Sequence, residues 1–316
     1  MQPMYSRSAF SRRHFLASAA AFSGAAGWLS GTASDAAEPK PFSFVFFTDP
    51  HVQPEKGATE GVKQAFAKVN ALEQRPDFVI TGGDLIMDAL NVGMDRVQLQ
   101  WDLWDECQKT LEVPIHHTVG NHDVTGWSSK AIVKPGDSGY GKAIFSERYG
   151  QGKTYRSFDH GGWHFVILDS IGQDPVTLDY KGWIDDDQLA WLKADLEKTG
   201  TQTPVILVTH IPFYSVWHQV LKGPAFPLDG KALVGNVFEF RKLLALYNIK
   251  LVLSGHGHIS ERIQFDKVVY LQGGAVCGMW WKGPVHGNPE GFVQIDCHPD
   301  GSFQDRYISY GWKARA

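Results

Sequence analysis

Residues 43–51 read Ser-Phe-Val-Phe-Phe-Thr-Asp-Pro-His, an apolar run that ends in an aspartate and a histidine. Successive side chains of a strand point to opposite faces, so Asp49 and His51, two residues apart, are predicted to share one face at the strand's end. Carboxylate and imidazole groups both bind metal ions in proteins. The stretch therefore predicts a strand that delivers two candidate metal ligands at its carboxyl end.

The same arrangement, an apolar run followed by a short polar cluster, recurs four more times. The runs are 78–81, 115–119, 205–209 and 251–254, and the clusters that follow them contain Asp84, Asn121-His122-Asp123, His210 and His256-Gly257-His258. In open α/β sheets, ligands bind at the carboxyl ends of strands, so clusters distant in sequence are predicted to meet in one crevice. A single polar residue there usually satisfies loop backbone, but five clusters together favour a metal site.

The remaining sequence alternates between helical and strand patterns. Apolar residues three or four apart predict helices at 62–72, 97–111, 189–196 and 240–247. A hairpin is predicted at 154–169, and strands at 267–272, 291–296 and 303–310. This alternation predicts a single α/β domain over residues 41–316, in which the carboxyl-terminal strands complete a second sheet.

The first 36 residues differ in character from the rest of the chain. Arg12 and Arg13 precede a mildly apolar stretch, 17–29, that is rich in Ala, Gly and Ser. This resembles a twin-arginine export signal that ends near residue 36. The stretch falls short of the about 20 strongly apolar residues of a stable membrane span. We therefore expect the twin-arginine export machinery as a partner and a periplasmic or extracellular location.

Composition narrows the functional class. The chain has 316 residues, enough for a sizeable core, and a formal net charge of -4. An acidic balance argues against general binding of nucleic acid or anionic membranes. Cys107, Cys277 and Cys297 include no close pair of the kind that binds zinc or serves redox chemistry. A Cys277–Cys297 bridge and buried, unpaired thiols are both open readings.

The five clusters, in this order, resemble those of the calcineurin-like metallophosphoesterases over roughly residues 43–260. The resemblance implies an α/β fold, a four-layer α-β-β-α sandwich of two mixed sheets flanked by helices. It also implies two divalent or trivalent metal ions at the strand ends. One would be held by Asp49, His51, Asp84 and His258, and the other by Asp84, Asn121, His210 and His256, with Asp84 bridging them. Nitrogen and oxygen ligands permit Mn, Fe or Zn.

The resemblance also implies a mechanism, in which a hydroxide that bridges the metals attacks phosphorus. His122, next to the ligand Asn121, would be the catalytic acid. Asp123 either orients His122 or holds the turn, and Asp88 is a weaker candidate. In the protein-phosphatase branch an aspartate three residues after the bridging one pairs with this histidine, whereas Met87 stands in that place here.

Substrate choice depends on loops around the metals. The Asp-x-His pattern of the first cluster, with no tyrosine soon after Asp84, departs from the purple acid phosphatases and is nearer the cyclic-nucleotide phosphodiesterase-like branch. Phe213 and Tyr214 either line the pocket mouth or pack. Four further residues are candidate substrate contacts, with packing as the alternative for the tryptophans: Asn121, Trp280, Trp281 and Lys282.

These patterns predict a metal-dependent hydrolase that acts on phosphodiesters or small phosphorylated molecules. A phosphomonoesterase or protein phosphatase is the first alternative, and a non-catalytic extracytoplasmic module that binds metal or phosphate is the second. Four other histidines have no supporting cluster and are expected to be strand or turn residues: His116, His117, His160 and His164.

Overall fold

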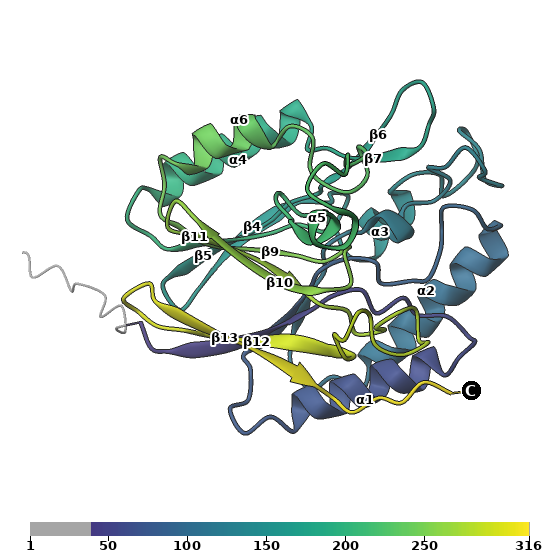
Figure 1. Ribbon diagram of the computed structural model, residues 1–316, viewed down its shortest axis with the longest axis horizontal. Helices are drawn as coiled ribbons and strands as arrows, with labels where there is room; N and C mark the ends of the chain where they lie inside the picture. The colour runs from purple at the N-terminus through teal and green to yellow at the C-terminus, as the bar shows by residue number, and fades with distance from the viewer. Residues whose placement is uncertain (1–38, 316) are drawn as a thin grey trace, which may run out of the picture. The chain divides into compact units, whose positions relative to one another are not determined.

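Two large mixed β-sheets lie face to face in the computed structural model, which describes residues 39–315 (Figure 1). The first sheet has the strand order β13 (Phe303–Ser309), β12 (Gly291–Cys297), β1 (Phe42–Phe47), β2 (Phe78–Thr81) and β3 (Ile115–His116). The second has the order β10 (Ser260–Phe265), β11 (Val268–Gly273), β9 (Ile249–Ser254), β8 (Val205–Val208), β5 (Trp163–Ile167) and β4 (Arg156–His160). The predicted export signal, residues 1–36, lies outside the described residues.

Parallel strands form one side of the first sheet and the centre of the second. In the first sheet β1, β2 and β3 are parallel, and in the second β11, β9, β8 and β5 are parallel. Antiparallel strands β12 and β13 complete the first sheet beside β1, and antiparallel strands β10 and β4 form the two edges of the second. The carboxyl ends of the parallel strands meet at one end of the sandwich, where all five polar clusters begin.

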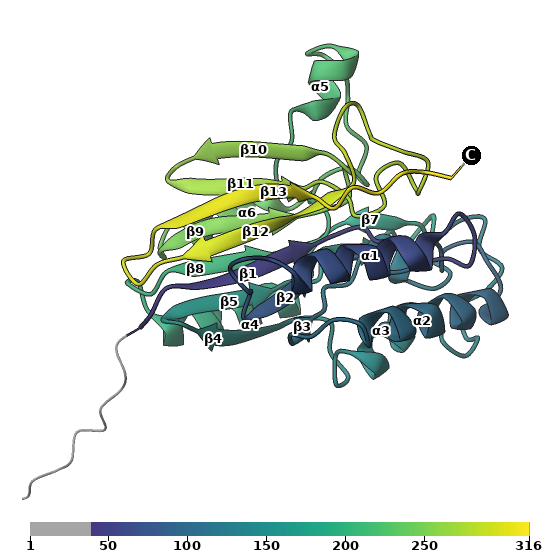
Figure 2. The same cartoon turned by 90° about the horizontal axis from the view of Figure 1, so that it is seen from below.

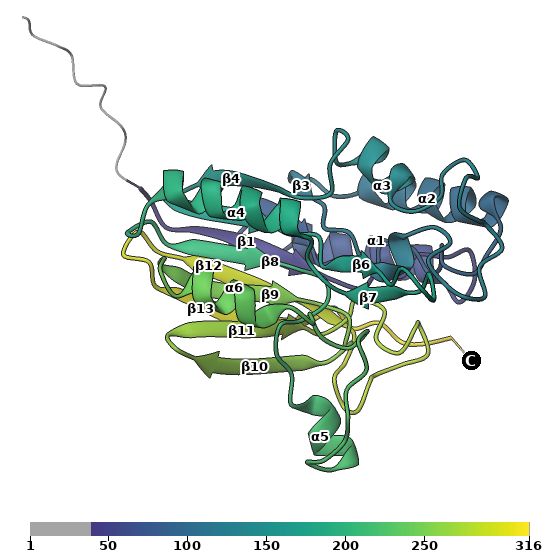
Figure 3. The same cartoon turned by 90° about the horizontal axis from the view of Figure 1, so that it is seen from above.

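Helices cover the outer faces of both sheets, as Figures 1 and 3 show. The first sheet carries α1 (Ala58–Asn70) and α2 (Met94–Gln108), and the second carries α4 (Asp186–Thr199) and α6 (Val237–Leu244). In α1 the buried residues Val62, Phe66 and Val69 recur every three or four positions. The predicted four-layer α/β sandwich is confirmed. Within residues 39–315, no helix has the length and the apolar character needed to cross a membrane.

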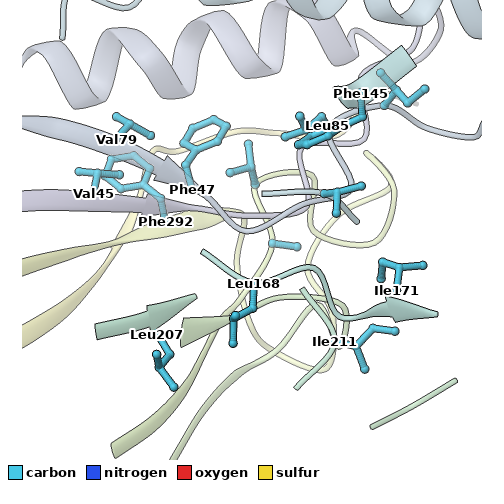
Figure 4. Packing of buried hydrophobic residues seen from close by; sticks show 14 of the residues in the cluster. Val45, Phe47, Val79, Leu85, Phe145, Leu168, Ile171, Leu207, Ile211 and Phe292 are labelled. Atoms are coloured by element: carbon cyan, nitrogen blue, oxygen red, sulfur yellow. The ribbon is translucent and has the colours of Figure 1, made fainter. Parts of the chain in front are cut away.

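Alternation along β1 supplies side chains to two cores. Phe44 and Phe46 point toward the second sheet, where they join an aromatic and aliphatic cluster between the sheets. Val45 and Phe47 point outward to the cluster that packs under the helices, shown in Figure 4. Phe47 stacks on Phe66 of α1 with ring centres 4.7 Å apart. Because both faces of β1 are buried, its register is fixed, and so is the place where it ends.

Several short elements escaped the sequence patterns. These are α3 (Ala143–Arg148), α5 (Trp217–Lys222), the hairpin of β6 (Ile171–Gln173) and β7 (Tyr180–Gly182), and the edge strand β10. Each of the first four is too short to show a period, and β10 is largely exposed, so it has no apolar run. Figure 2 shows α5 standing away from the sheets. The helix predicted at 97–111 ends at Gln108, and β3 is shorter than the predicted run 115–119.

The three cysteines are buried and free. Cys297 lies in the cluster between the sheets. Cys277 lies beside the polar clusters, with its Sγ 3.9 Å from Nδ1 of His258. The Cys277–Cys297 bridge is therefore the wrong reading, and buried, unpaired thiols are the correct one. Burial raises the pKa of Cys297 to about 12 and so keeps this thiol protonated.

Candidate metal centre

The backbone of five candidate ligands lies in the left-handed region. Their φ angles are 54° at Asp49, 42° at His51, 53° at Asp84, 71° at His256 and 56° at His258. A residue other than glycine in this region costs roughly 1–3 kcal/mol, and such residues cluster at functional sites. The predicted reason for the pairing of Asp49 and His51 is therefore wrong, because β1 ends at Phe47 and left-handed turns, not strand alternation, aim the two side chains.

The ligand-bearing loops approach one another so closely that two positions require glycine. A Cβ at Gly120 would lie 2.1 Å from the backbone nitrogen of Asp84, and one at Gly255 would lie 2.3 Å from Oδ2 of Asp49. The backbone nitrogen of His51 donates to the carbonyl of Asp84 across 3.0 Å. Loops that follow strands of the first sheet thus meet at backbone contact distance, and the loop after β9 of the second sheet lies against the side chain of Asp49.

The first group of ligand-type side chains surrounds His51. Its Nε2 lies 3.0 Å from Nε2 of His258, 3.5 Å from Oδ2 of Asp84 and 3.8 Å from Oδ1 of Asp49. Nε2 of His258 lies 3.3 Å from the same Asp49 oxygen. All four side chains are buried. They are the four that the resemblance assigns to one metal.

The second group surrounds His210. Its Nε2 lies 3.2 Å from Oδ2 of Asp84 and 2.9 Å from Oδ1 of Asn121. The ring of His256 has its centre 5.1 Å from that of His210, and ligand atoms of Asp84, His210 and His256 all lie within 4.8 Å of one another. Asp84 therefore belongs to both groups. The structure brings together all seven side chains predicted to bind metal.

Backbone carbonyls orient two of these imidazoles. Nδ1 of His210 lies 2.7 Å from the carbonyl of Gly82, and Nδ1 of His258 lies 2.7 Å from the carbonyl of Gly278. A carbonyl only accepts, so each Nδ1 carries a proton, and when the ring is neutral its Nε2 turns a lone pair toward other acceptors. Such lone pairs repel unless a proton or a cation lies between them. The residues fit a pair of metal ions, and their imidazole, carboxylate and amide donors suit Mn, Fe or Zn.

The charge of the centre favours a cation as well. Burial opposes ionisation of Asp84, but positive charge on His210 and His122 holds the pKa of this carboxyl well below its usual range. Burial opposes protonation of His210, but the charge of Asp84 and a hydrogen bond to it raise the pKa of His210 to about 9. A buried carboxylate that recruits a proton in this way offers the same attraction to a metal ion.

His122 lies at the edge of the first group. Its ring centre is 4.8 Å from that of His51, and its backbone nitrogen donates to Oδ1 of Asp84 across 2.8 Å. Nδ1 lies 2.6 Å from the carbonyl of Met87, which fixes the proton on that nitrogen. Nε2 has no hydrogen-bond partner within residues 39–315. The backbone of Met87 thus orients His122 from the position where the protein-phosphatase branch uses a carboxylate.

Asp123 holds the loops rather than the histidine. Its carboxylate accepts the backbone N–H groups of Gly120 and Leu85 across 2.8 Å each, and that of Ile86 across 3.2 Å. Burial raises its pKa well above the ordinary value. Of the two predicted roles, these hydrogen bonds favour holding the turn. Asp88 accepts backbone N–H groups of its own turn, and within residues 39–315 its side chain makes no hydrogen bond to His122.

The two adjacent tryptophans have different surroundings. Trp281 is only 1% exposed, its Nε1 donates to the carbonyl of His51 across 3.1 Å, and a Cβ at Gly61 of α1 would meet its ring. The prediction that Trp281 contacts substrate is therefore wrong, and the packing alternative is correct. Trp280 is 39% exposed, with its ring centre 5.1 Å from that of His258. Lys282 is exposed.

Phe213 and Tyr214 pack instead of lining the pocket mouth. Phe213 is buried against Phe240 of α6, with ring centres 5.7 Å apart, and Tyr214 meets Tyr270 edge-on at 4.8 Å. Sequence reasoning missed the carbonyls that orient the histidines, since a backbone carbonyl carries no residue signature. It also missed Tyr180 of β7, whose ring centre lies 6.5 Å from that of His256.

The profile of the calcineurin-like phosphoesterases matches residues 42–260. The chain belongs to this family. Membership confirms the predicted family and the enzyme class, metallophosphoesterase. The residues gathered at the strand ends are the candidate metal ligands of this calcineurin-like phosphoesterase.

Relatives of known name differ in how much of their length is matched. Purple acid phosphatase 23 of Arabidopsis thaliana is 30% identical over 174 residues, which cover 54% of this chain but 34% of that protein. The 3',5'-cyclic-nucleotide phosphodiesterase alr5338 of a Nostoc species is 23% identical over 249 residues, or 76% of this chain and 80% of that protein. A dimetal phosphatase from Danio rerio shares the fold, with a TM-score of 0.59, 16% identity and coverage of 85% and 99%.

Proposed function

We propose that this calcineurin-like phosphoesterase is an exported hydrolase with two metal ions that cleaves phosphodiesters or small phosphorylated molecules. The observation that carries the proposal is the place of Asp84, whose Oδ2 lies 3.5 Å from His51 and 3.2 Å from His210. One carboxylate is thus shared by two groups of ligands. Two cations held there would neutralise charge on the phosphoryl oxygens and lower the pKa of a coordinated water.

The chain's own residues divide the work of holding the ions. Three side chains complete each group around Asp84: Asp49, His51 and His258 in the first, and Asn121, His210 and His256 in the second. The carbonyls of Gly82 and Gly278 keep two of the rings in the tautomer that offers Nε2 as the ligand atom. Rigid carbonyl contacts of this kind reduce the reorganisation that binding requires.

His122 is the proposed catalytic acid. The carbonyl of Met87 accepts its Nδ1 proton, and Nε2 remains available to carry a second proton. When the bond between phosphorus and the leaving oxygen breaks, that proton passes from Nε2 to the oxygen, and the ring becomes neutral. General acid catalysis of this kind contributes roughly 10²–10⁴-fold in rate.

Two features support diester substrates over phosphoproteins. The match covers 80% of alr5338 and 81% of a probable cyclic nucleotide phosphodiesterase of Coxiella burnetii, against 34% and 42% of two purple acid phosphatases. Met87 orients His122 through its backbone, which departs from the carboxylate of the protein-phosphatase branch. Export is proposed from the Arg12-Arg13 pattern.

Initial rates on two chromogenic esters test the proposal. The full-length chain is loaded with Mn and assayed on bis(4-nitrophenyl) phosphate and on 4-nitrophenyl phosphate. We expect a preference for the diester and a loss of roughly 10²-fold or more in kcat for His122→Ala with metal content unchanged. His160→Ala is the control, because His160 pairs with Asp77 at the surface. A monoester preference would indicate a phosphatase, and bound metal without turnover would favour the binding-module alternative.

The leaving group identifies the role of His122. An alkoxide needs a proton to leave, whereas 4-nitrophenolate leaves readily without one. His122→Ala is therefore expected to slow a dialkyl phosphate more than a 4-nitrophenyl ester. Equal losses on both would show that His122 acts by another route, such as binding the phosphoryl group.

Cell fractionation tests export. The wild-type chain is expected in the extracytoplasmic fraction, and the double variant Arg12→Lys, Arg13→Lys is expected to accumulate in the cytoplasm. Equal distributions of the two chains would contradict twin-arginine export while leaving the phosphoesterase proposal intact.

A further inference from the structure

A cavity of about 290 Å³ opens beside His256, on the side of the second ligand group. Two segments outside the sheets, here called the two wall segments, line the cavity. One is the β6–β7 hairpin, and the other is the stretch between β8 and α6 that contains α5. The lining residues used below are Tyr180, Trp217, His218, Asp229 and Lys231. None of them belongs to the predicted metal ligands, and no sequence pattern singled them out.

Tyr180 connects the cavity with the metal centre. Its ring stands perpendicular to that of His256, with centres 6.5 Å apart. The phenol O–H of Tyr180 can donate a hydrogen bond. Within residues 39–315 the hydroxyl has no hydrogen-bond partner. Tyr180 thus lines the cavity together with His256, a predicted metal ligand.

Lys231 connects the two wall segments through its side chain. Its Nζ lies 3.1 Å from Oδ2 of Asp179, next to β7, and 5.0 Å from the ring centre of Tyr180. Asp229 uses one carboxylate oxygen, Oδ1, to accept the backbone N–H groups of Lys231 and Ala232. Nζ of Lys231 and Oδ2 of Asp229 therefore keep donor and acceptor capacity for a bound molecule.

Trp217 forms the other aromatic wall. Its ring meets that of His286 edge-on, with centres 4.6 Å apart, and the backbone nitrogen of Val216 donates to Oε1 of Glu261 across 2.9 Å. These contacts hold the start of α5 against β10 and the loop before β12. The wall is fixed on both sides although α5 itself stands clear of the sheets (Figure 2).

We propose that this cavity binds the ring-bearing alcohol substituent of a phosphodiester, with a nucleoside as the chemical class that fits. Two aromatic side chains suit a flat ring, and Lys231, Asp229 and His218 suit its donors and acceptors. The phosphate then lies at the metals and the substituent beside His256. The inference rests on the proposed function and assigns the residues that select its substrate.

Two diesters with the same leaving group test the cavity. One is the 4-nitrophenyl ester of thymidine 5'-monophosphate, and the other is methyl 4-nitrophenyl phosphate, whose methyl group leaves the cavity empty. For the full-length, Mn-loaded chain, Trp217→Ala is expected to raise KM for the thymidine ester about 10-fold or more, with kcat within about twofold and the methyl ester unaffected. Lys231→Met is expected to raise the same KM about fivefold.

Matched variants separate recognition from loss of structure. Trp217→Phe keeps an aromatic wall and is expected to retain most of the affinity. Val220→Ala changes an exposed residue of α5 that does not line the cavity, so both esters should be unaffected. Equal effects of Trp217→Ala on the two diesters, or no effect on either, would overturn the inference while turnover by the wild type upholds the proposed function.

Calorimetric binding of thymidine 5'-monophosphate tests the cavity without turnover. Wild type is expected to bind this ligand about 10-fold more tightly than Trp217→Ala, in the presence of Mn. Equal affinities would overturn the inference. A wild type that binds the ligand but hydrolyses neither diester would contradict the proposed function and keep the cavity assignment.

Discussion

Two groups of histidines in this molecule differ in what surrounds their rings. The site histidines, His51, His210, His256 and His258, follow parallel strands and converge on two aspartates. The edge histidines, His116, His117, His160 and His164, lie in or next to β3, β4 and β5. Burial lowers the pKa of two members of each group: His51 and His256 in the first, and His116 and His117 in the second, to about 4 for His256 and His116. Burial and depressed basicity therefore do not distinguish the groups.

The partners of each ring distinguish them. His116 stacks on Phe158 with centres 4.1 Å apart, and His117 stacks on Tyr149 at 4.0 Å. His164 uses both nitrogens on carboxylates, 2.7 Å and 2.9 Å away. Two site histidines, His210 and His258, instead give Nδ1 to carbonyls, and their Nε2 atoms face Oδ1 of Asn121 and Nε2 of His51, respectively. Convergent lone pairs, rather than a number of histidines, define a place for metal.

Removal of metal is expected to have the largest effect, and it should affect the site histidines but not the edge histidines. Exhaustive chelation is expected to abolish turnover and to lower Tm, because a ligand held at 100 times its Kd stabilises the fold by about 2.7 kcal/mol. Added Mn²⁺ should restore both. Initial rates and thermal unfolding measure the effect, and NMR signals of the edge histidines should stay unchanged. Full activity in a metal-free chain would refute the metal centre.

Replacement of the shared carboxylate is expected to have the second-largest effect on activity. Asp84→Asn removes the charge that both groups share, so kcat/KM is expected to fall roughly 10³-fold with loss of bound metal. Asp159→Asn, which alters the exposed partner of His164, is the matched control and should stay within about twofold. Metal content and initial rates on the diester measure the two effects. Retention of both metals together with more than a tenth of the activity would contradict the bridging role.

A smaller effect is expected from the contact behind His51. Trp281→Phe keeps an aromatic side chain, though a smaller one, and removes the hydrogen bond from Nε1 to the His51 carbonyl. Positioning contacts of this kind are worth roughly 10–100-fold in metal affinity, so the Mn²⁺ requirement should rise about 10-fold. Trp312→Phe is the control, because Trp312 meets Trp281 edge-on and has no bond to His51. Equal metal titrations for the two variants would show that the contact only packs.

The edge histidines provide the smallest effect on activity. The pKa of His116 is lowered to about 4 by burial and by the nearby Arg156, while an unfolded histidine titrates near about 6.5. The unfolded chain therefore binds more protons between these values, and stability falls as the pH drops through this window. His116→Phe keeps the stack on Phe158 and removes the titration. Its Tm should fall less than that of wild type between pH 7 and pH 5, with activity at pH 7 unchanged.

An acid-dependent loss of Tm that is identical in wild type and His116→Phe would show that other groups carry this pH dependence. A loss of activity at pH 7 would place the edge histidines in the working site after all.

The sandwich and the convergence of the seven ligand-type residues follow from sequence, because the runs that precede Asp49, Asp84 and His210 are apolar on both faces. Strands of that kind are buried and parallel, and their carboxyl ends meet. The reason why Asp49 and His51 point together did not follow, since a left-handed turn leaves no period in the sequence. The outcome was predictable and the local geometry was not.

The residues around the metal centre were harder to predict from the sequence. Trp280 and Trp281 are the same residue type, and what distinguishes them is that Trp281 packs against α1 and Trp312, contacts that no sequence pattern shows. The Met87 carbonyl orients His122 whatever side chain stands there. Tyr180 and Lys231 lie in the two wall segments of the cavity and contact each other. The helix and strands of these segments are too short to leave a period in the sequence. Sequence reasoning therefore reached the ligands but not what positions them.

The left-handed turns give the centre an evolutionary consequence. Glycine or asparagine would relieve the backbone at Asp49, His51, Asp84, His256 and His258, so each present side chain trades stability for chemistry. A descendant released from selection for hydrolysis would gain stability by losing these residues first, well before its core. Such a degenerate paralogue would keep the sandwich, carry glycines where the ligands stand, and melt at a higher temperature than the active enzyme without its metals.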